Sequence, residues 1–213
     1  MVKPDSSVFS YKLTHDTGFA PNPFGATLTL ATCKPGMRKS KHKGDWIAGF
    51  TSKQLINDSP VGSERLIYLM RVGEKQRFKD YFTDDRFRDK IPDMSAKGAQ
   101  AKAGDNIYKP LHTDALALPE FKQLENPNHP PPHNKKHDLS GEYVLIADEF
   151  YYFGKSALQL PGDIRPKVPP GMSRYGFLTD AAKAEKFIEY IRRKYKPGIH
   201  GYPHCWPDAE SEA

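Results

Sequence analysis

Short stretches in which apolar and polar residues alternate, separated by turns, fill the first third of the chain and restrict the folds open to it. Alternation with a period of two is typical of half-buried β-strands. The predicted strands cover residues 8–13, 27–32, 45–50, 65–72 and 142–148. Closely spaced short strands favour a mostly antiparallel sheet, or a sheet that closes toward a barrel, over a parallel sheet with alternating helices.

One long helix is predicted near the end of the chain, over residues 179–195. Its apolar residues recur at helical spacing and form one stripe, made of Ala184, Phe187, Ile188, Ile191 and Tyr195. Such a stripe packs against another layer of structure. A short amphipathic helix or turn is predicted over residues 78–88. We therefore expect an α+β fold: a curved, mostly antiparallel sheet or a partly closed barrel, with the C-terminal helix packed across it.

The chain has 213 residues, enough for one domain with its own core. We expect a single domain over residues 1–203, followed by a loose tail at residues 204–213. Residues 124–138 are rich in proline, asparagine and histidine. Because proline cannot occupy a central strand, this segment is expected to be an irregular insertion.

The chain carries a formal net charge of +6, and basic residues gather at 34–43 and along the predicted C-terminal helix. Basic clusters attract phosphate, although basic residues near a helix C-terminus also favour the helix dipole as a solvated face. Cys33 and Cys205 lie near opposite ends, which disfavours a disulfide framework. The sequence shows no charged and apolar leader and no apolar run of about 18 residues. We expect a cytoplasmic protein that binds nucleic acid or nucleotide and no membrane.

The loop of residues 16–24 reads Asp-Thr-Gly-Phe-Ala-Pro-Asn-Pro-Phe. Proline fixes φ and removes a backbone donor, whereas glycine permits positive φ. The loop is therefore expected to hold Phe19, Asn22 and Phe24 in one rigid arrangement that suits a pocket wall. The alternative is an ordinary surface connection whose phenylalanines anchor in the core.

Metal binding is suggested by the eight histidines, of which His129, His133 and His137 recur every four residues. A helix would align them, but the prolines at 130–132 prevent one, and no Cys-x-x-Cys pair accompanies them. We predict no metal site. Phosphate-loop, dinucleotide and serine-elbow motifs are absent, so the sequence identifies no cofactor.

Cys33 is the candidate nucleophile. It follows a predicted strand and precedes Lys34 and Arg38, whose positive charge would favour the reactive thiolate. His15 or Asp16 is the expected assisting group. The alternative is that Cys33 is a small, buried apolar residue.

A second set of residues suits a planar, anionic ligand. Aromatic side chains can stack on a base, each stack contributing about 1–3 kcal/mol, and asparagine can bond to a base edge. The candidates for base or nucleotide binding are Phe19, Asn22, Asp45, Trp46, Asp105, Asn106 and Tyr108, and those for phosphate are Lys34, Arg38 and Lys53. The alternative is that the aromatic residues fill a core and that the aspartates of the Gly-Asp pairs cap turns.

An ordered series of short motifs spans most of the chain. They are Gly-Phe-Ala-Pro-Asn-Pro-Phe at 18–24, Leu-Ala-Thr-Cys-Lys-Pro at 30–35, Gly-Asp-Trp-Ile at 44–47, Leu-Ile-Tyr at 66–68, Gly-Asp-Asn-Ile-Tyr at 104–108 and Phe-Tyr-Tyr-Phe-Gly at 150–154. In these motifs the chain resembles the second family of nucleotide-modification-associated domains. The resemblance implies a role around modified bases in bacteria or their phages and names no reaction.

A weaker similarity concerns the fold. The order of residues 44–47 and 65–72 resembles that of PUA-like barrels, including the EVE and ASCH types. This similarity implies a barrel that cups a modified base in an aromatic pocket.

These observations support two hypotheses and leave a third open. The first is a module that binds a nucleotide or modified base. The second is a transferase or hydrolase of nucleotide or DNA hypermodification with Cys33 as the nucleophile, and the third is a non-enzymatic interaction protein. The first two share one expectation, because loops at one end of a sheet collect into sites. The residues expected to line one cavity are Asn22, Cys33, Asp45, Trp46, Asp105 and Tyr108.

Overall fold

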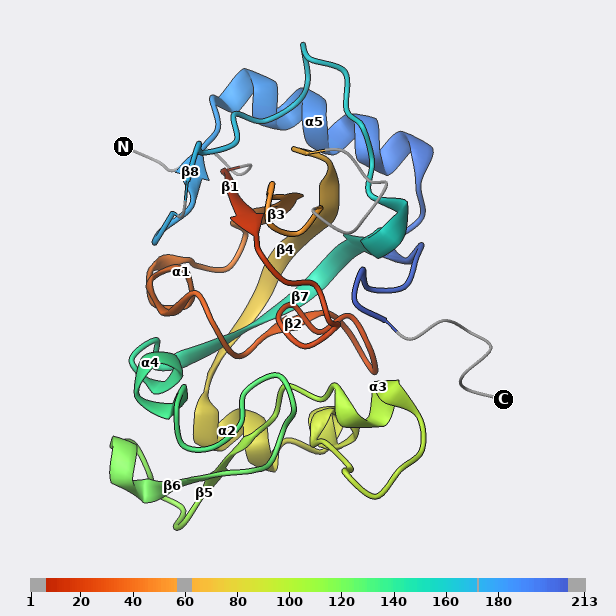
Figure 1. Cartoon of the computed structure of the whole chain (residues 1–213). Helices are drawn as coiled ribbons and strands as arrows, with labels where there is room; N and C mark the ends of the chain where they lie inside the picture. The colour runs from red at the N-terminus through yellow and green to blue at the C-terminus, as the bar shows by residue number, and fades with distance from the viewer. Residues whose placement is uncertain (1–6, 57–62, 172, 207–213) are drawn as a thin grey trace. The chain divides into compact units, whose positions relative to one another are not determined.

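Figure 1 shows the computed structural model, which describes residues 7–56, 63–171 and 173–206. The chain divides into two compact units. Unit 1 comprises Met1–Asp16, Lys41–Glu74 and Ala147–His204, and unit 2 comprises Thr17–Ser40, Lys75–Ile146 and Cys205–Ala213. The expectation of a single domain over residues 1–203 stays a prediction.

Seven strands form one sheet, in the order β2-β7-β4-β3-β1-β8 with β9 beside β7. They are β1 (Val8–Leu13), β2 (Thr29–Leu30), β3 (Trp46–Thr51), β4 (Leu66–Arg77), β7 (Tyr143–Tyr152), β8 (Phe177–Leu178) and β9 (Gly198–Ile199). The pairs β1–β8, β2–β7 and β3–β4 are antiparallel, whereas β1–β3 and β7–β9 are parallel. Among the described strands no pairing closes the sheet into a barrel. The expected α+β fold with a mostly antiparallel sheet is therefore confirmed, in its open form.

The core of unit 1 joins sheet residues to the helix α5 (Ala181–Lys194). This helix begins where the Asp180 carboxylate accepts bonds from the N–H groups of Ala182 and Lys183. The cluster on which it packs includes Trp46, Phe50, Leu66, Leu69, Tyr151, Phe187, Ile188 and Ile191. The predicted packing of the C-terminal helix on the sheet is confirmed (Figure 1).

Unit 2 is built from short elements joined by irregular segments. Its α-helices are α1 (Pro35–Ser40), α2 (Phe78–Thr83), α3 (Ala99–Lys102) and α4 (Lys135–Leu139). Its short 3-10 helices are η1 (Asp85–Lys90) and η2 (Leu118–Glu120), whereas η3 (Gly154–Ser156) belongs to unit 1. The strands β5 (Tyr108–Pro110) and β6 (Phe121–Gln123) pair with each other in antiparallel orientation. In the part of the chain that the structure describes, no helix has the length and apolar content needed to cross a membrane.

Several predicted elements differ in their bounds from the structure, and three of them differ most. The segment 78–88, predicted as a short helix or turn, forms α2 and η1. It is interrupted at Asp84, which has an extended backbone and whose carboxylate accepts a bond from the Arg86 N–H at the start of η1. The strand predicted over 27–32 is reduced to Thr29–Leu30. The irregular segment 124–138 runs into the helix α4 at its end.

The tail predicted to be loose begins with packed residues. The ring of Trp206 lies 5.1 Å from that of Phe24, measured between centroids, and the two form a small apolar cluster with Ala103. Residues 207–213 of the predicted tail lie outside the described residues.

Replacing Phe187 by Ala is expected to destabilise unit 1, because this side chain is fully buried in its core. The free energy of unfolding should fall by about 3–5 kcal/mol, as for other buried aromatic residues. Replacing the exposed neighbour Lys186 by Ala should change it by less than about 0.5 kcal/mol. Denaturant unfolding of both variants measures the difference, and equal effects would contradict the packing described here.

Candidate active site

A sharp turn presents Cys33. Between the end of β2 and the start of α1, Cys33 and Lys34 have φ angles of 55° and 37°. Positive φ is strained in residues other than glycine, and such residues cluster at functional sites. A nucleophile on a strained strand-to-helix turn is also the arrangement of the nucleophile elbow in hydrolases. The side chain of Cys33 is half-buried.

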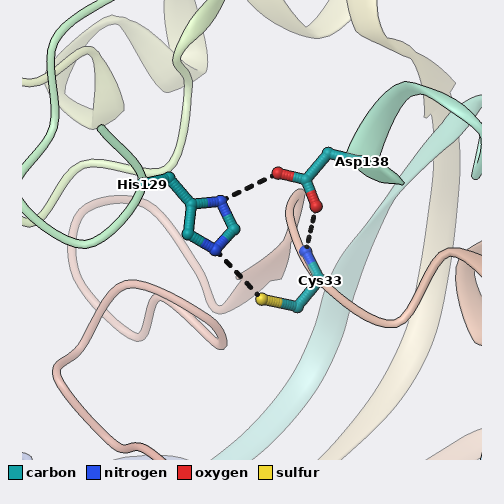
Figure 2. A group of neighbouring side chains, drawn as sticks. All are labelled: Cys33, His129 and Asp138. Atoms are coloured by element: carbon teal, nitrogen blue, oxygen red, sulfur yellow. Dashed lines mark hydrogen bonds and ion pairs between the residues drawn. The ribbon is translucent and has the colours of Figure 1, made fainter. Parts of the chain in front are cut away.

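Cys33 forms a connected group with His129 and Asp138, which come from two other segments of unit 2 (Figure 2). Cys33 Sγ lies 3.4 Å from His129 Nε2, and His129 Nδ1 lies 2.9 Å from Asp138 Oδ2. Asp138 Oδ1 accepts a bond of 2.7 Å from the backbone N–H of Cys33. The Asp138 side chain is fully buried, and that of His129 is 11% exposed. Thiol, imidazole and carboxylate are therefore linked in the order of a catalytic triad.

Arg38 holds the backbone around these residues. It is fully buried, and its guanidinium donates to the carbonyl oxygens of Cys33 at 2.8 Å, Asp138 at 2.5 Å and Tyr143 at 2.6 Å. The planar, forked shape of the group suits several acceptors at once. A phosphate could reach Arg38 only if some of these bonds were broken. Its expected phosphate role stays a prediction.

Three basic side chains interact with Cys33, of which His129 contacts the sulfur. Burial alone would lower the pKa of His129, but the bonds to Asp138 and Cys33 outweigh it and raise that pKa to about 9. Burial lowers the pKa of Arg38 to about 10, a shift that Asp138 and Cys33 oppose. Burial also lowers the pKa of Lys34, and the electrostatic interaction with Cys33 opposes that shift. In cysteine enzymes the reactive form is the thiolate, and a charged imidazole is the partner that commonly supports it.

Neighbouring side chains fix His129 and Asp138. The rings of Phe19 and His129 meet edge-on with their centroids 4.8 Å apart. Gln123 Nε2 donates to the His129 carbonyl at 2.9 Å, and the Tyr108 hydroxyl donates to Asp138 Oδ2 at 2.7 Å. Two of the predicted site residues, Phe19 and Tyr108, thus contact this group. Both are almost fully buried, so their predicted role in stacking on a base remains a prediction.

The same three residues have the spacing of a metal site, since one ligand atom from each lies within 4.8 Å of the others. The bonding pattern favours a triad instead. Both oxygens of Asp138 already accept bonds, Oδ1 from Cys33 and Oδ2 from His129 and Tyr108. The Cys33 thiol and His129 Nε2 are then the two atoms of this cluster left to bind a metal. Catalytic zinc usually takes three protein ligands. The absence of a metal site stays a prediction.

The predicted residues Asn22, Asp105 and Asn106 take part in a second buried network of unit 2. The Asn22 side-chain oxygen accepts a bond of 2.8 Å from Lys90 Nζ. Asp105 accepts a bond of 2.7 Å from the Tyr81 hydroxyl, and Asn106 donates to the Tyr81 carbonyl at 3.2 Å. Burial raises the pKa of Asp105 and lowers that of Lys90 to about 8. Their expected roles in base binding stay predictions.

The assisting groups expected for Cys33 belong to unit 1. Asp16 is buried and accepts bonds from the Tyr152 hydroxyl and from His204 Nδ1, the latter at 2.9 Å. His15 is exposed. Cys33 instead has His129 as its imidazole partner in unit 2.

The other predicted residues of unit 1 are Asp45, Trp46 and Lys53. Asp45 accepts a bond of 2.9 Å from the His42 N–H in the turn before β3, which is the turn-capping alternative. Trp46 belongs to the apolar core, and Lys53 is exposed. Convergence of the predicted residues of both units on one cavity stays a prediction.

His129 and Asp138 were missed as partners of Cys33. In the sequence His129 stands out only as one of three histidines that a helix would align and that the prolines at 130–132 keep off a helix. A triad has no fixed spacing in sequence, because its members are neighbours in space and not along the chain. The only sequence signal was the presence of histidine and aspartate in an irregular segment rich in polar residues.

The fold and the site define an α+β protein with a Cys-His-Asp group at a strained strand-to-helix turn. A family model described as Nucleotide modification associated domain 2 matches residues 5–210. The chain therefore belongs to this family, and the resemblance seen in its motifs is confirmed. Membership indicates involvement in nucleotide or DNA modification. Neither a curated protein nor a solved structure matches the chain.

Replacing Gly141 by Ala is expected to disturb the site through Arg38. A Cβ atom at this position would lie 2.6 Å from Arg38 Nη1, so the guanidinium must move and weaken its three carbonyl bonds. We expect a loss of about 1–3 kcal/mol of stability and slower alkylation of Cys33 by iodoacetamide. Gly162→Ala is the control, because a Cβ there meets nothing within 4 Å. Equal behaviour of the two variants would exclude this role for Arg38.

The titration of His129 tests the triad directly. Its ring should titrate near pH 9 in NMR spectra, and Asp138→Asn should lower that midpoint, because the carboxylate stabilises the imidazolium. Since the folded pKa lies above the ordinary value, the His129 contribution to stability is present below about pH 6.5 and disappears as the pH rises through about 9. A midpoint at or below the ordinary value would contradict the arrangement.

Proposed function

We propose that this protein is a thiol-dependent acyltransferase or hydrolase of nucleotide or DNA modification, with Cys33 as the nucleophile. The observation that carries the proposal is the linkage of Cys33 Sγ, His129 and Asp138 by contacts of 3.4 and 2.9 Å. Membership of the nucleotide-modification family supports a nucleotide or DNA as the acceptor of the acyl group. Acyl transfer is the chemistry for which a nucleophile, an imidazole and an orienting carboxylate are best suited.

The reaction would have two steps. In the first, the Cys33 thiolate attacks the carbonyl carbon of an acyl donor, a C–S bond forms, and the leaving group departs with the proton of the His129 imidazolium. In the second, an amine or hydroxyl of the nucleotide, or water, attacks the thioester. Its proton passes to His129 and the thiolate of Cys33 leaves. Asp138 bonds to Nδ1 and so holds the ring with Nε2 toward the sulfur.

The strained turn and the nearby charges support this role. The φ angle of 55° at Cys33 costs conformational energy, and such strain is concentrated where a side chain must be presented to a substrate. The Lys34 ammonium interacts electrostatically with Cys33 and is placed to stabilise negative charge that develops there.

The binding-module hypothesis receives less support from the same structure. Asn22 and Tyr108 are almost fully buried, and their polar groups bond to Lys90 and Asp138. Trp46 is buried in the core of unit 1. A base could reach these groups only by displacing such contacts, whereas the half-buried Cys33 already has its imidazole partner.

Replacing Cys33 by Ser should abolish the modification, because serine keeps the shape of the side chain but not the acidity of the thiol. The measurement is nucleoside analysis, by mass spectrometry, of DNA and nucleotides from cells that carry the gene with its native neighbours. We expect a loss of about 10³-fold or more. The matched control is Cys205→Ser, since Cys205 is exposed and also free.

Two outcomes would contradict the proposal. The first is full modification in cells with Cys33→Ser. The second is alkylation of Cys33 and Cys205 by iodoacetamide at equal rates in the native protein, with the labelled residues identified by peptide mass. Preferential labelling of Cys33 near neutral pH supports it, because Cys33 alone of the two has an imidazole partner.

A further inference from the structure

We infer that Tyr108 is a positioning residue of the triad. Its hydroxyl sets the strength of the hydrogen bond between Asp138 and the His129 ring. The inference rests on the catalytic role proposed above. It assigns to Tyr108 a task other than contact with substrate.

The first argument is the way in which Asp138 Oδ2 is shared. This one oxygen accepts a bond of 2.7 Å from the Tyr108 hydroxyl and lies 2.9 Å from His129 Nδ1. Two donors on one oxygen divide its negative charge between them. Each bond is therefore weaker than it would be alone, and the tyrosine bond withdraws charge that would otherwise attract the imidazolium proton.

The second argument is the geometry of the β5–β6 pair. Tyr108 and Gln123 are directly opposite each other in its register, and opposite residues of an antiparallel pair project from the same face. From that face Tyr108 reaches Asp138, and Gln123 reaches the carbonyl of His129 at 2.9 Å. The same two strands therefore fix the carboxylate and the imidazole in relation to each other.

The third argument is that Tyr108 keeps its proton. Burial raises the pKa of Tyr108 far above its usual range, and the Asp138 carboxylate raises it further. The ring also packs edge-on against Phe78, with centroids 5.4 Å apart, and Tyr108 is almost fully buried. Tyr108 therefore remains a neutral donor at any pH at which His129 titrates.

Other charged and titratable groups also act on this site. They are Cys33 and Lys34 from the turn before α1, Arg38 from α1, and the more distant Asp105, which acts on Arg38. None of these groups changes when Tyr108 becomes phenylalanine. The substitution thus isolates one hydrogen bond on Asp138 Oδ2.

The test compares Tyr108→Phe with Tyr81→Phe. Each substitution removes one buried hydroxyl that donates to a carboxylate at 2.7 Å in unit 2, but Tyr81 donates to Asp105. The first readout is the NMR titration midpoint of the His129 ring. The second is the rate at which iodoacetamide alkylates Cys33 as a function of pH, in the Cys205→Ser background, so that no substrate is needed.

Tyr108→Phe should raise the His129 midpoint by about one pH unit, because hydrogen bonds to charged groups contribute about 1.5–3 kcal/mol and Asp138 Oδ2 then has one donor left. The curve of the Cys33 alkylation rate against pH should shift together with the His129 midpoint. Tyr81→Phe should leave both readouts unchanged. Thermal unfolding of both variants is the control that checks whether each remains folded.

An unchanged or lowered midpoint in folded Tyr108→Phe would overturn the inference, even if stability falls. The inference requires a rise, whereas a purely structural disturbance would weaken the bond between Asp138 and His129 and lower the midpoint. The two proposals fail separately. If the midpoint is unmoved but Cys33→Ser still abolishes modification, only the role of Tyr108 is wrong. If the midpoint rises but Cys33→Ser keeps modification, the triad geometry stands and the proposed function fails.

Discussion

The fully buried carboxylate of Asp138 is the group on which the candidate site depends. A buried charge without partners is costly, so a stable fold must bring donors to it. Asp138 receives them from the Cys33 backbone, from Tyr108 and from His129. The first of these donors is 105 residues away in sequence. One carboxylate therefore links the backbone of the nucleophile to the imidazole.

The same requirement explains how unit 2 holds its irregular segments. Its helices and strands are short, and backbone groups outside regular structure need other partners when they are buried. Buried side chains supply the donors instead. Arg38 bonds three carbonyls, Asn126 bonds that of Gly104 at 3.0 Å, and Gln123 bonds that of His129. In the 16–24 loop, Asn22 accepts a bond from Lys90 and donates one to the carbonyl of Ala103.

The fold could be predicted where the signal was local. The alternation at residues 8–13 and the apolar stripe of the C-terminal helix each reflect one face packed against a core, and both elements form as expected. The helix or turn predicted over 78–88 forms as two short helices, because the Asp84 side chain caps a new turn, which apolar spacing does not reveal. The choice of an open sheet over a barrel depends on which edges pair, and periodicity carries no information about pairing.

The sequence by itself determined the α+β class, the family and the candidacy of Cys33, because these depend on residue order and on local chemistry. It also identified Lys34 and Arg38 as basic neighbours of Cys33. It did not show that Arg38 is buried and donates to three carbonyl oxygens. Only the tertiary structure decided that His129 and Asp138 complete the group around the thiol. The physical reason is that hydrogen bonds between side chains are set by distance in space, and the irregular segment that carries His129 has no period from which that distance could be inferred.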